Sequence, residues 1–224
     1  MNLAKFPRRR YTAGQTPLER LPRFSEALGG PNVWMKRDDL LGLTAGGNKT
    51  RKLEFLAADA LAKGADTLIT CGAVQSNHCR LTLAAAVKEG LKCRLVLEER
   101  IPGSYDPQAG GNNLLYNLLG AEQVRVVPAG ASLPDEMAAV DGELAAAGRK
   151  GYVIPGGGSN PLGALGYAAC AQEIAAQMFD LGLDLDAIFC ASGSAGTQAG
   201  LIAGLQGCGT NVPVLGINVS RTKE

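Results

Sequence analysis

The sequence is poor in aromatic residues, in histidine and in net charge. Aromatics make up 5% of the 224 residues, His78 is the single histidine, and Lys plus Arg exceed Asp plus Glu by 22 − 21 = 1. A net charge of +1 provides no general attraction to nucleic acid or to an anionic membrane, so we expect neither as a partner. With one histidine and no cluster of thiolate and imidazole ligands around it, we expect no metal site.

Long apolar runs and paired cysteine motifs are also missing. No stretch approaches the roughly 20 apolar residues needed to cross a bilayer, and residues 1–7 lack the apolar core of a signal peptide. None of the six cysteines belongs to a Cys-x-x-Cys pair, and most lie within apolar runs. These features predict reduced thiols in a cytoplasmic protein.

The remaining composition, with 46% hydrophobic residues and 30 glycines, favours an α/β fold in which helices pack closely on a sheet. Short apolar runs predict strands at residues 33–36, 67–70, 93–97, 124–127, 152–154, 187–190 and 214–219. Helices are predicted at residues 50–63, 77–89, 112–119, 135–147, 161–179 and 197–205.

This alternation predicts parallel sheets flanked by helices, with right-handed crossovers. Because the predicted strands are continuously apolar, we expect both sheet faces to be buried. Residues 11–22 are predicted to be irregular. The six strand–helix units fall short of the eight of a (β/α)₈ barrel, an alternative that periodicity alone leaves open.

Lys49 follows a glycine-rich turn, Gly46-Gly47-Asn48, and opens a predicted helix. A lysine in such a place can approach a cofactor closely, and an amine with a lowered pKa can form a Schiff base. Taken alone, it is more typical of a loop lysine that precedes a helix. A phosphate-binding P-loop is not favoured, because Asn48 occupies the position of its last glycine and no apolar strand leads directly into the turn.

Three further polar or glycine-rich segments lie between a predicted strand and a predicted helix. Ser76, Asn77 and His78 begin a helix, where they either cap it or hold a small carboxylate. Residues 155–161 form a Gly- and Pro-rich turn that serves as a hinge or faces a substrate. Residues 192–197 combine small residues with a helix start, which predicts a phosphate site. Neither glycine segment completes the dinucleotide fingerprint Gly-x-Gly-x-x-Gly.

These segments, in this order, resemble the fold type II pyridoxal-phosphate enzymes, the tryptophan synthase β-like fold. Within them the chain is most similar to the branch of D-cysteine desulfhydrase, L-cysteate sulfo-lyase and 1-aminocyclopropane-1-carboxylate (ACC) deaminase. The resemblance rests on Lys36-Arg37-Asp38-Asp39, Gly46-Gly47-Asn48-Lys49, Arg51-Lys52-Leu53-Glu54-Phe55, Gln75-Ser76-Asn77-His78 and Ser192-Gly193-Ser194-Ala195-Gly196-Thr197. It covers essentially the whole chain.

The resemblance implies a role for each matching residue. Lys49 would bind pyridoxal 5'-phosphate covalently and move the substrate's α-proton. Asn77 would contact the phenolic oxygen of the cofactor, and the cofactor phosphate would be bound by Ser194, Ala195, Gly196 and Thr197. The substrate carboxylate would be held by Ser76, Asn77 and His78, with Ser76 as a second acid–base group and Gly158 at the substrate's border.

The same resemblance implies two domains and a homodimer. A small domain of residues 53–158 would be inserted into a large cofactor-binding domain of residues 1–52 and 159–224, with the cofactor between them. Family members extend well beyond the position where this sequence ends. The resemblance therefore implies a missing C-terminal part, which would carry the group facing the pyridine nitrogen and a substrate-side tyrosine.

The implied reaction is an α,β-elimination from a small β-substituted amino acid, giving pyruvate, ammonia and a sulfur leaving group. Residues 40–44 and 79–82 look more like those of cysteate enzymes, which favours sulfite from L-cysteate over sulfide from D-cysteine. His78 after Asn77 argues against ACC deaminase, the alternative in the same branch. A non-catalytic cofactor-binding relative and a nicotinamide-dependent oxidoreductase are the hypotheses from other classes.

Overall fold

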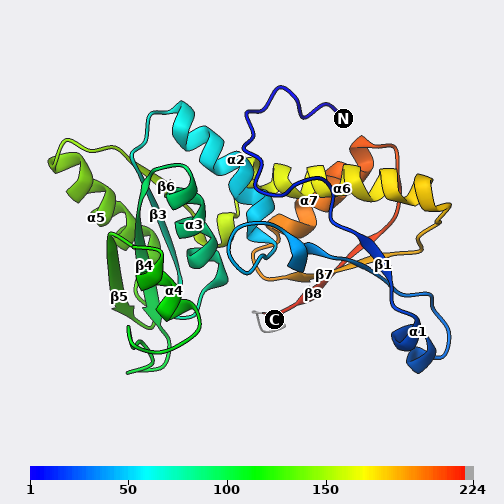
Figure 1. Cartoon of the computed structure of the whole chain (residues 1–224), viewed down its shortest axis with the longest axis horizontal. Helices are drawn as coiled ribbons and strands as arrows, with labels where there is room; N and C mark the ends of the chain where they lie inside the picture. The colour runs from blue at the N-terminus through cyan, green and yellow to red at the C-terminus, as the bar shows by residue number, and fades with distance from the viewer. Residues whose placement is uncertain (220–224) are drawn as a thin grey trace.

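The structure is a computed structural model and describes residues 1–219. Its elements form two groups, which lie on either side of helix α2 (Lys49–Ala62) (Figure 1). One group surrounds a four-stranded sheet, and the other surrounds a two-stranded parallel sheet together with two long helices. The domain boundaries at residues 52–53 and 158–159 stay a prediction. Within residues 1–219, none of the helices combines the length and apolar content that a membrane span requires.

The four-stranded sheet is parallel throughout, in the order β5-β4-β3-β6. Its strands are β3 (Thr67–Ala73), β4 (Lys92–Glu99), β5 (Gln123–Pro128) and β6 (Gly151–Ile154). Helices α3 (Asn77–Lys88), α4 (Asn112–Leu118) and α5 (Leu133–Ala146) connect them. The parallel sheet and its crossover helices are therefore as predicted from the alternation of apolar runs.

Both faces of this sheet are covered. Successive residues of β3 point to opposite faces, so that Leu68 joins a core with α2 and α3 while Ile69 joins a core with α5. The same alternation occurs on β4, where Leu95 and Val96 belong to different cores. All four of these side chains are at most 1% exposed. The continuous apolar strands thus correspond to burial on both faces, as predicted.

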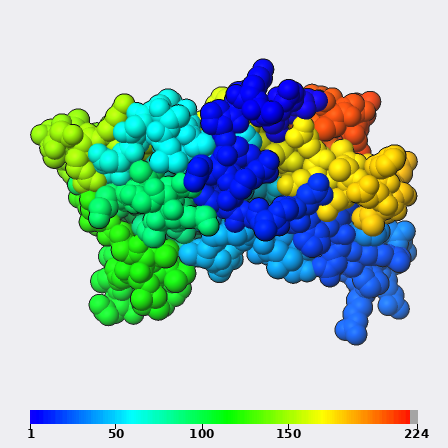
Figure 2. Space-filling model, turned by 45° about the horizontal axis from the view of Figure 1, so that its top comes forward, coloured from blue at the N-terminus to red at the C-terminus, as the bar shows by residue number. Residues whose placement is uncertain are grey.

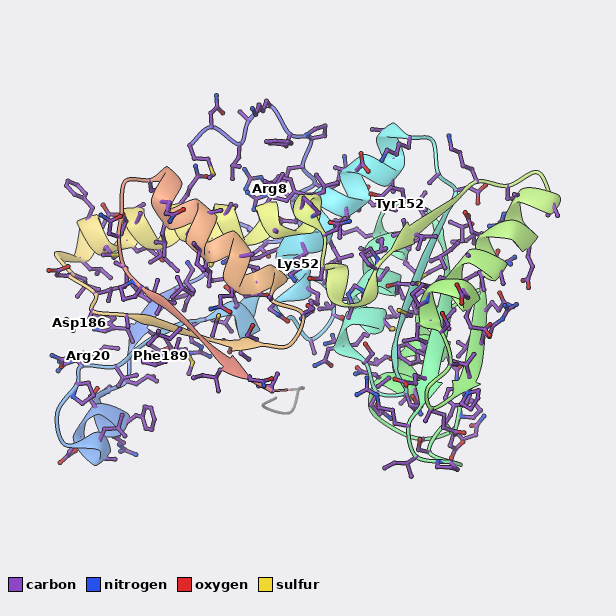
Figure 3. All side chains as sticks on the ribbon, turned by 180° about the vertical axis from the view of Figure 1, so that it is seen from behind. Arg8, Arg20, Lys52, Tyr152, Asp186 and Phe189 are labelled. Atoms are coloured by element: carbon purple, nitrogen blue, oxygen red, sulfur yellow. The ribbon has the colours of Figure 1, made fainter. Side chains whose placement is uncertain are left out.

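The second group contains the long helix α6 (Pro161–Leu181), helix α7 (Gly196–Gly207) and the parallel strands β7 (Ile188–Ser192) and β8 (Val214–Asn218). Helices α6 and α7 share a core that includes Tyr167 and Leu201, and Ile188 and Val214 pack against it. Phe189, on the opposite face of β7, is 67% exposed (Figure 3). The loop between β7 and α7 contacts the segment just before α6, where the Ser159 hydroxyl donates to the Ser194 carbonyl at 3.0 Å.

The first 45 residues are more ordered than the sequence suggests. Strand β1 (Leu18–Arg20) pairs antiparallel with β2 (Trp34–Lys36), and helix α1 (Pro22–Leu28) lies between them. The prediction that residues 11–22 are irregular was therefore wrong for β1, which is too short and too polar to give a strand pattern. The chain before β1 runs across the middle of the molecule (Figure 2), where the backbone N–H of Arg9 donates to the Glu54 carbonyl at 2.8 Å.

Candidate functional site

A cavity of about 670 Å³ lies beside the start of α2, within the size range of cofactor and ligand sites. Its walls come from the β2 segment, the start of α2, the turn after β6, helix α6, strand β7 and the start of α7. The predicted site residues among its lining are Lys49, Ser194, Ala195 and Thr197. Gly156 and Gly157, which belong to the predicted turn at residues 155–161, line it as well. The cavity therefore brings together the predicted cofactor lysine and the predicted phosphate segment.

Lys49 is the first residue of α2, and its side chain is half-buried at the cavity. Burial lowers the pKa of Lys49 because the charged amine is less well solvated there than in water. Its Nζ donates to the Asn48 side-chain oxygen at 3.1 Å, and no carboxylate within residues 1–219 pairs with it. A lysine with a lowered pKa and no ion pair is suited to bond covalently to a carbonyl group.

Lys52 lies beside the cavity without lining it, and no role was predicted for it from the sequence. It is 1% exposed, and its Nζ donates to the Gly157 carbonyl at 3.2 Å (Figure 3). Burial and the neighbouring charge of Lys49 lower the pKa of Lys52 to about 8. Lys49 and Lys52 are three residues apart on one helix and so share a face. Lys49 at the cavity and Lys52 beside it make this end of the site positive. Asp38, the one carboxylate among the cavity-lining residues of the described chain, is bonded to Arg51 and Tyr167.

The start of α7 is shaped to hold an anion near these amines. Ala195 adopts a left-handed conformation with φ 57° and ends the loop, so the free N–H groups of the first helical turn follow it directly. A Cβ at Gly196 would lie 2.5 Å from the Ser159 hydroxyl oxygen and 3.1 Å from Lys52 Nζ. A Cβ at Gly157 would contact Lys49 Cε and the Ser194 hydroxyl. Glycine at both positions leaves space between the lysines and the helix start.

These features fit pyridoxal phosphate. The Lys49 amine suits its aldehyde, the helix start and Lys52 suit its phosphate, and the cavity volume suits its ring. Cavity walls supplied by Tyr167, Ile188 and Leu201 provide apolar surface beside these polar groups.

The Ser76–Asn77–His78 segment lies at the end of β3, outside the cavity lining. Ser76 caps α3, since its hydroxyl oxygen accepts a hydrogen bond from the Cys79 backbone N–H at 3.2 Å. Asn77 is exposed, and its side-chain oxygen accepts from the side chains of Asn112 and Arg80. The predicted capping role of this segment is therefore confirmed at Ser76, and its predicted contact with a substrate stays a prediction.

The His78 side chain turns away from the exposed surface of this segment. It is 5% exposed, and its Nε2 lies 2.8 Å from the Thr70 hydroxyl, which donates to the Ile154 carbonyl. Burial lowers the pKa of His78 to about 3, with smaller contributions from the charges of Lys49 and Lys52, so the ring is neutral near pH 7. Any contact between His78 and a carboxylate would therefore have to come from its backbone N–H. Gly158 is also buried, against Lys52 and Leu56.

A network of buried charges supports the start of α2. Arg51 is 1% exposed and forms two hydrogen bonds to each of two carboxylates, Asp38 and Glu173. Tyr167 donates to Asp38 at 2.8 Å, and Lys36 pairs with Glu173 at 2.9 Å. The network joins the segment after β2, helix α2 and helix α6 directly behind Lys49. It therefore restricts how the lysine can move relative to the cavity wall.

Residues 10–224 match the profile of the family described as pyridoxal-phosphate dependent enzyme. The chain is 47% identical over 222 residues to a D-cysteine desulfhydrase of Klebsiella pneumoniae (strain 342), covering 99% of this chain and 67% of that protein. It is 48% identical over 220 residues to a D-cysteine desulfhydrase of Serratia proteamaculans (strain 568), covering 98% and 66%. The chain thus spans about two thirds of the length of these relatives.

The chain is also similar to solved structures. A crystal structure of an ACC deaminase homologue superposes with a TM-score of 0.90 at 45% identity, covering 99% of this chain and 66% of that one. A crystal structure of a threonine deaminase from T.th. superposes with a TM-score of 0.70 at 22% identity, covering 92% and 59%. The second likeness shows the fold, and with the first it supports the expected α/β architecture with parallel sheets between helices.

Proposed function

The chain belongs to the family of pyridoxal-phosphate dependent enzymes, and we propose that it acts as a carbon–sulfur lyase on a small β-substituted amino acid. Support for this activity comes from the two relatives named D-cysteine desulfhydrase, which are 47% and 48% identical to the chain. For D-cysteine, the proposed reaction consumes one water and gives pyruvate, ammonia and hydrogen sulfide. The observation that carries the proposal is the half-buried Lys49 amine in the cavity that faces the start of α7.

When bound, the cofactor supplies an electron sink for the negative charge left at the substrate's Cα. The part of the reaction assigned to this chain is the handling of the proton. Lys49 Nζ accepts the Cα proton, a role favoured by a lowered pKa because the amine is then more often neutral. The Arg51 network behind Lys49 keeps the amine at the cavity wall, which holds the two reacting atoms close together.

The phosphate is assigned to Ser194, Ala195, Gly196 and Thr197, with Lys52 as an additional cation. Backbone N–H groups at a helix start and a buried ammonium both favour a doubly charged anion. This assignment is supported by the space that Gly196 leaves beside Lys52 Nζ.

The substrate is assigned to the segment at the start of α3. Ser76, Asn77 and His78 would hold its carboxylate, His78 through the backbone N–H. Asn77 would also contact the phenolic oxygen of the cofactor. Ser76 remains the proposed second acid–base group, and Gly158 the proposed border of the substrate. Binding at this segment would place the carboxylate at the positive end of a helix.

Among substrates, D-cysteine and L-cysteate are the first two to compare. The named relatives favour D-cysteine, whereas the motifs at residues 40–44 and 79–82 favour L-cysteate. ACC, which would give 2-oxobutyrate, is the alternative that the ACC deaminase homologue suggests. The proposed homodimer is a separate matter, which sedimentation of the purified chain would decide.

The experiment begins with the visible absorption band that forms when pyridoxal phosphate is added to the purified protein. We expect the band in the wild type and its loss in Lys49→Ala. Lys63→Ala, at the exposed end of the same helix, is the matched control and should keep the band. Absence of the band in the wild type would refute the proposal.

The second step measures products. Sulfide from D-cysteine, sulfite from L-cysteate and 2-oxobutyrate from ACC identify the substrate directly. A protein that forms the band but gives none of these products would be a non-catalytic cofactor-binding relative.

A further inference from the structure

The side-chain oxygen of Asn77 is occupied by two donors. It accepts from Asn112 Nδ2 at 2.9 Å and from Arg80 Nη2 at 3.4 Å. A carbonyl oxygen has two lone pairs, so these two bonds use its whole capacity as an acceptor. Within residues 1–219, the Asn77 Nδ2 group donates no hydrogen bond, and Asn77 is exposed.

Hydrogen bonds to backbone groups determine which atom of the Asn112 side-chain amide faces Asn77. Asn112 Nδ2 also donates to the Gln75 carbonyl at 2.8 Å, and a backbone carbonyl can only accept. This identifies the amide nitrogen of Asn112, and hence the side of Asn112 that faces Asn77. Gln75 is oriented in the same way, because its side-chain oxygen accepts from the Asn112 backbone N–H at 2.8 Å. The orientation of the Asn77 amide therefore follows from groups whose donor and acceptor roles are fixed.

Arg80 supplies the second donor and has no acidic partner. Its residue is 4% exposed, and no carboxylate within residues 1–219 forms an ion pair with it. Its other bonds go to neutral acceptors, the Thr44 hydroxyl at 2.6 Å and the Gly46 carbonyl at 3.2 Å. A guanidinium only donates hydrogen bonds, so it too can face only the oxygen of the Asn77 amide. The same side chain thus links the start of α3 to the turn that precedes Lys49.

We propose that Arg80 and Asn112 are positioning residues that fix the Asn77 amide with its oxygen toward their side chains and its NH₂ group directed away from them, available as a donor to a ligand. The inference rests on the proposed function, which assigns Asn77 to the cofactor and the substrate. The inferred orientation limits the ligand of Asn77 to groups that accept a hydrogen bond. Asn77 can donate to an anionic oxygen, such as a phenolate or a carboxylate, and cannot accept from an ammonium group.

The first test reads the orientation in the cofactor-free protein, so it does not depend on the proposed function. In an Arg80→Met background, which lacks the other donor, Asn112→Asp replaces a donor by an acceptor of the same shape and should turn the Asn77 amide so that its NH₂ group faces residue 112. In NMR spectra the Asn77 side-chain amide signal, assigned by its loss in Asn77→Ala, should move downfield and exchange more slowly with water. Asn117→Asp adds the same charge to the exposed side of α4 and should leave this signal in place. In the Arg80→Met background, an Asn77 amide signal that is the same with Asn112 and with Asp at position 112 would overturn the proposal.

The second test measures the dissociation constant for pyridoxal phosphate, and it holds even if Asn112→Asp does not fold. Arg80→Met should weaken binding about tenfold, the effect of losing one well-oriented hydrogen bond. In an Asn77→Ala background the same substitution should weaken binding less than about twofold, because the amide it orients is gone. An equal loss in both backgrounds would show that Arg80 acts elsewhere. If the wild type itself bound no pyridoxal phosphate, the proposed function would fail, while the NMR result would still decide the orientation of Asn77.

Discussion

Replacing Arg51 by methionine tests whether the buried charge network holds the start of α2. Methionine keeps much of the volume but removes hydrogen bonds to Asp38 and Glu173 at 2.8 to 2.9 Å. The side chains of these three residues are 2%, 17% and 13% exposed, so the two carboxylates would lose a cation that water replaces only in part.

The expected loss in the free energy of unfolding depends on the partners that each carboxylate retains. Removing one partner of a buried ion pair costs about 3–5 kcal/mol. Asp38 retains the Tyr167 hydroxyl at 2.8 Å, and Glu173 retains Lys36 at 2.9 Å. We therefore expect the lower end of the range, about 3 kcal/mol. At about 2–4 °C per kcal/mol for a chain of this size, the melting temperature should fall by roughly 6–12 °C.

Urea unfolding of the cofactor-free protein, followed by circular dichroism, measures this loss. Arg100→Met is the matched control, because Arg100 is 69% exposed and surface changes of this kind usually stay within about 0.5 kcal/mol. A loss below about 1 kcal/mol in Arg51→Met would refute the reasoning, because the network would then contribute no more than a surface ion pair.

Three further results are expected. Gly166→Ala should lower the free energy of unfolding by about 1–3 kcal/mol, since its Cβ would lie 2.3 Å from the Arg51 carbonyl oxygen. Gly142→Ala, at a helix position with open space around it, should raise the free energy of unfolding by up to about 1 kcal/mol. Urea unfolding in which both variants change stability in the same direction would contradict this reasoning. Burial alone raises the pKa of Glu173, but Arg51 and Lys36 outweigh it and lower the pKa below 4.5. The stabilising contribution of Glu173 is therefore present above about pH 4.3 and lost as pH falls through the lowered pKa. The melting temperature of Glu173→Gln should accordingly depend less steeply on acid pH than that of the wild type. The pKa of Lys52 is lowered to about 8, so binding of pyridoxamine phosphate, measured by calorimetry, should weaken as pH rises through 8, and an unchanged affinity up to pH 9 would argue against Lys52 as a phosphate ligand.

Much of the fold was predictable because the central strands are apolar without interruption. Strands β3, β4, β5 and β6 agree with their predicted positions to within a few residues, since each lies between polar or glycine-containing turns. Strand β1 was missed for a physical reason. Its residues Leu18–Arg20 are half-buried or exposed and pair with β2 at a polar edge, so no apolar run marks them.

Side-chain directions in the site were harder to predict than its segments. Asn77 and His78 are adjacent in a motif that the sequence treats as one group, yet one is exposed and the other is buried against Thr70. Consecutive helical residues point about 100° apart, so an amphipathic stripe would normally separate them. Helix α3 has no such stripe, because residues 78–86 are all buried. Periodicity therefore could not tell which of the two side chains faces outward.

Lys52 escaped prediction for the opposite reason. Sequence reasoning places lysines on the surface, and a fully buried lysine is rare unless it is paired. Here the lysine is 1% exposed, its one hydrogen bond within residues 1–219 goes to a backbone carbonyl, and it lies beside a second amine. A buried lysine beside a second, half-buried amine, with no carboxylate paired to either within residues 1–219, costs stability, and proteins tolerate such costs at functional sites. The spacing of three residues between Lys49 and Lys52 was visible in the sequence, but it became informative only once α2 was known to be buried on nearly all sides.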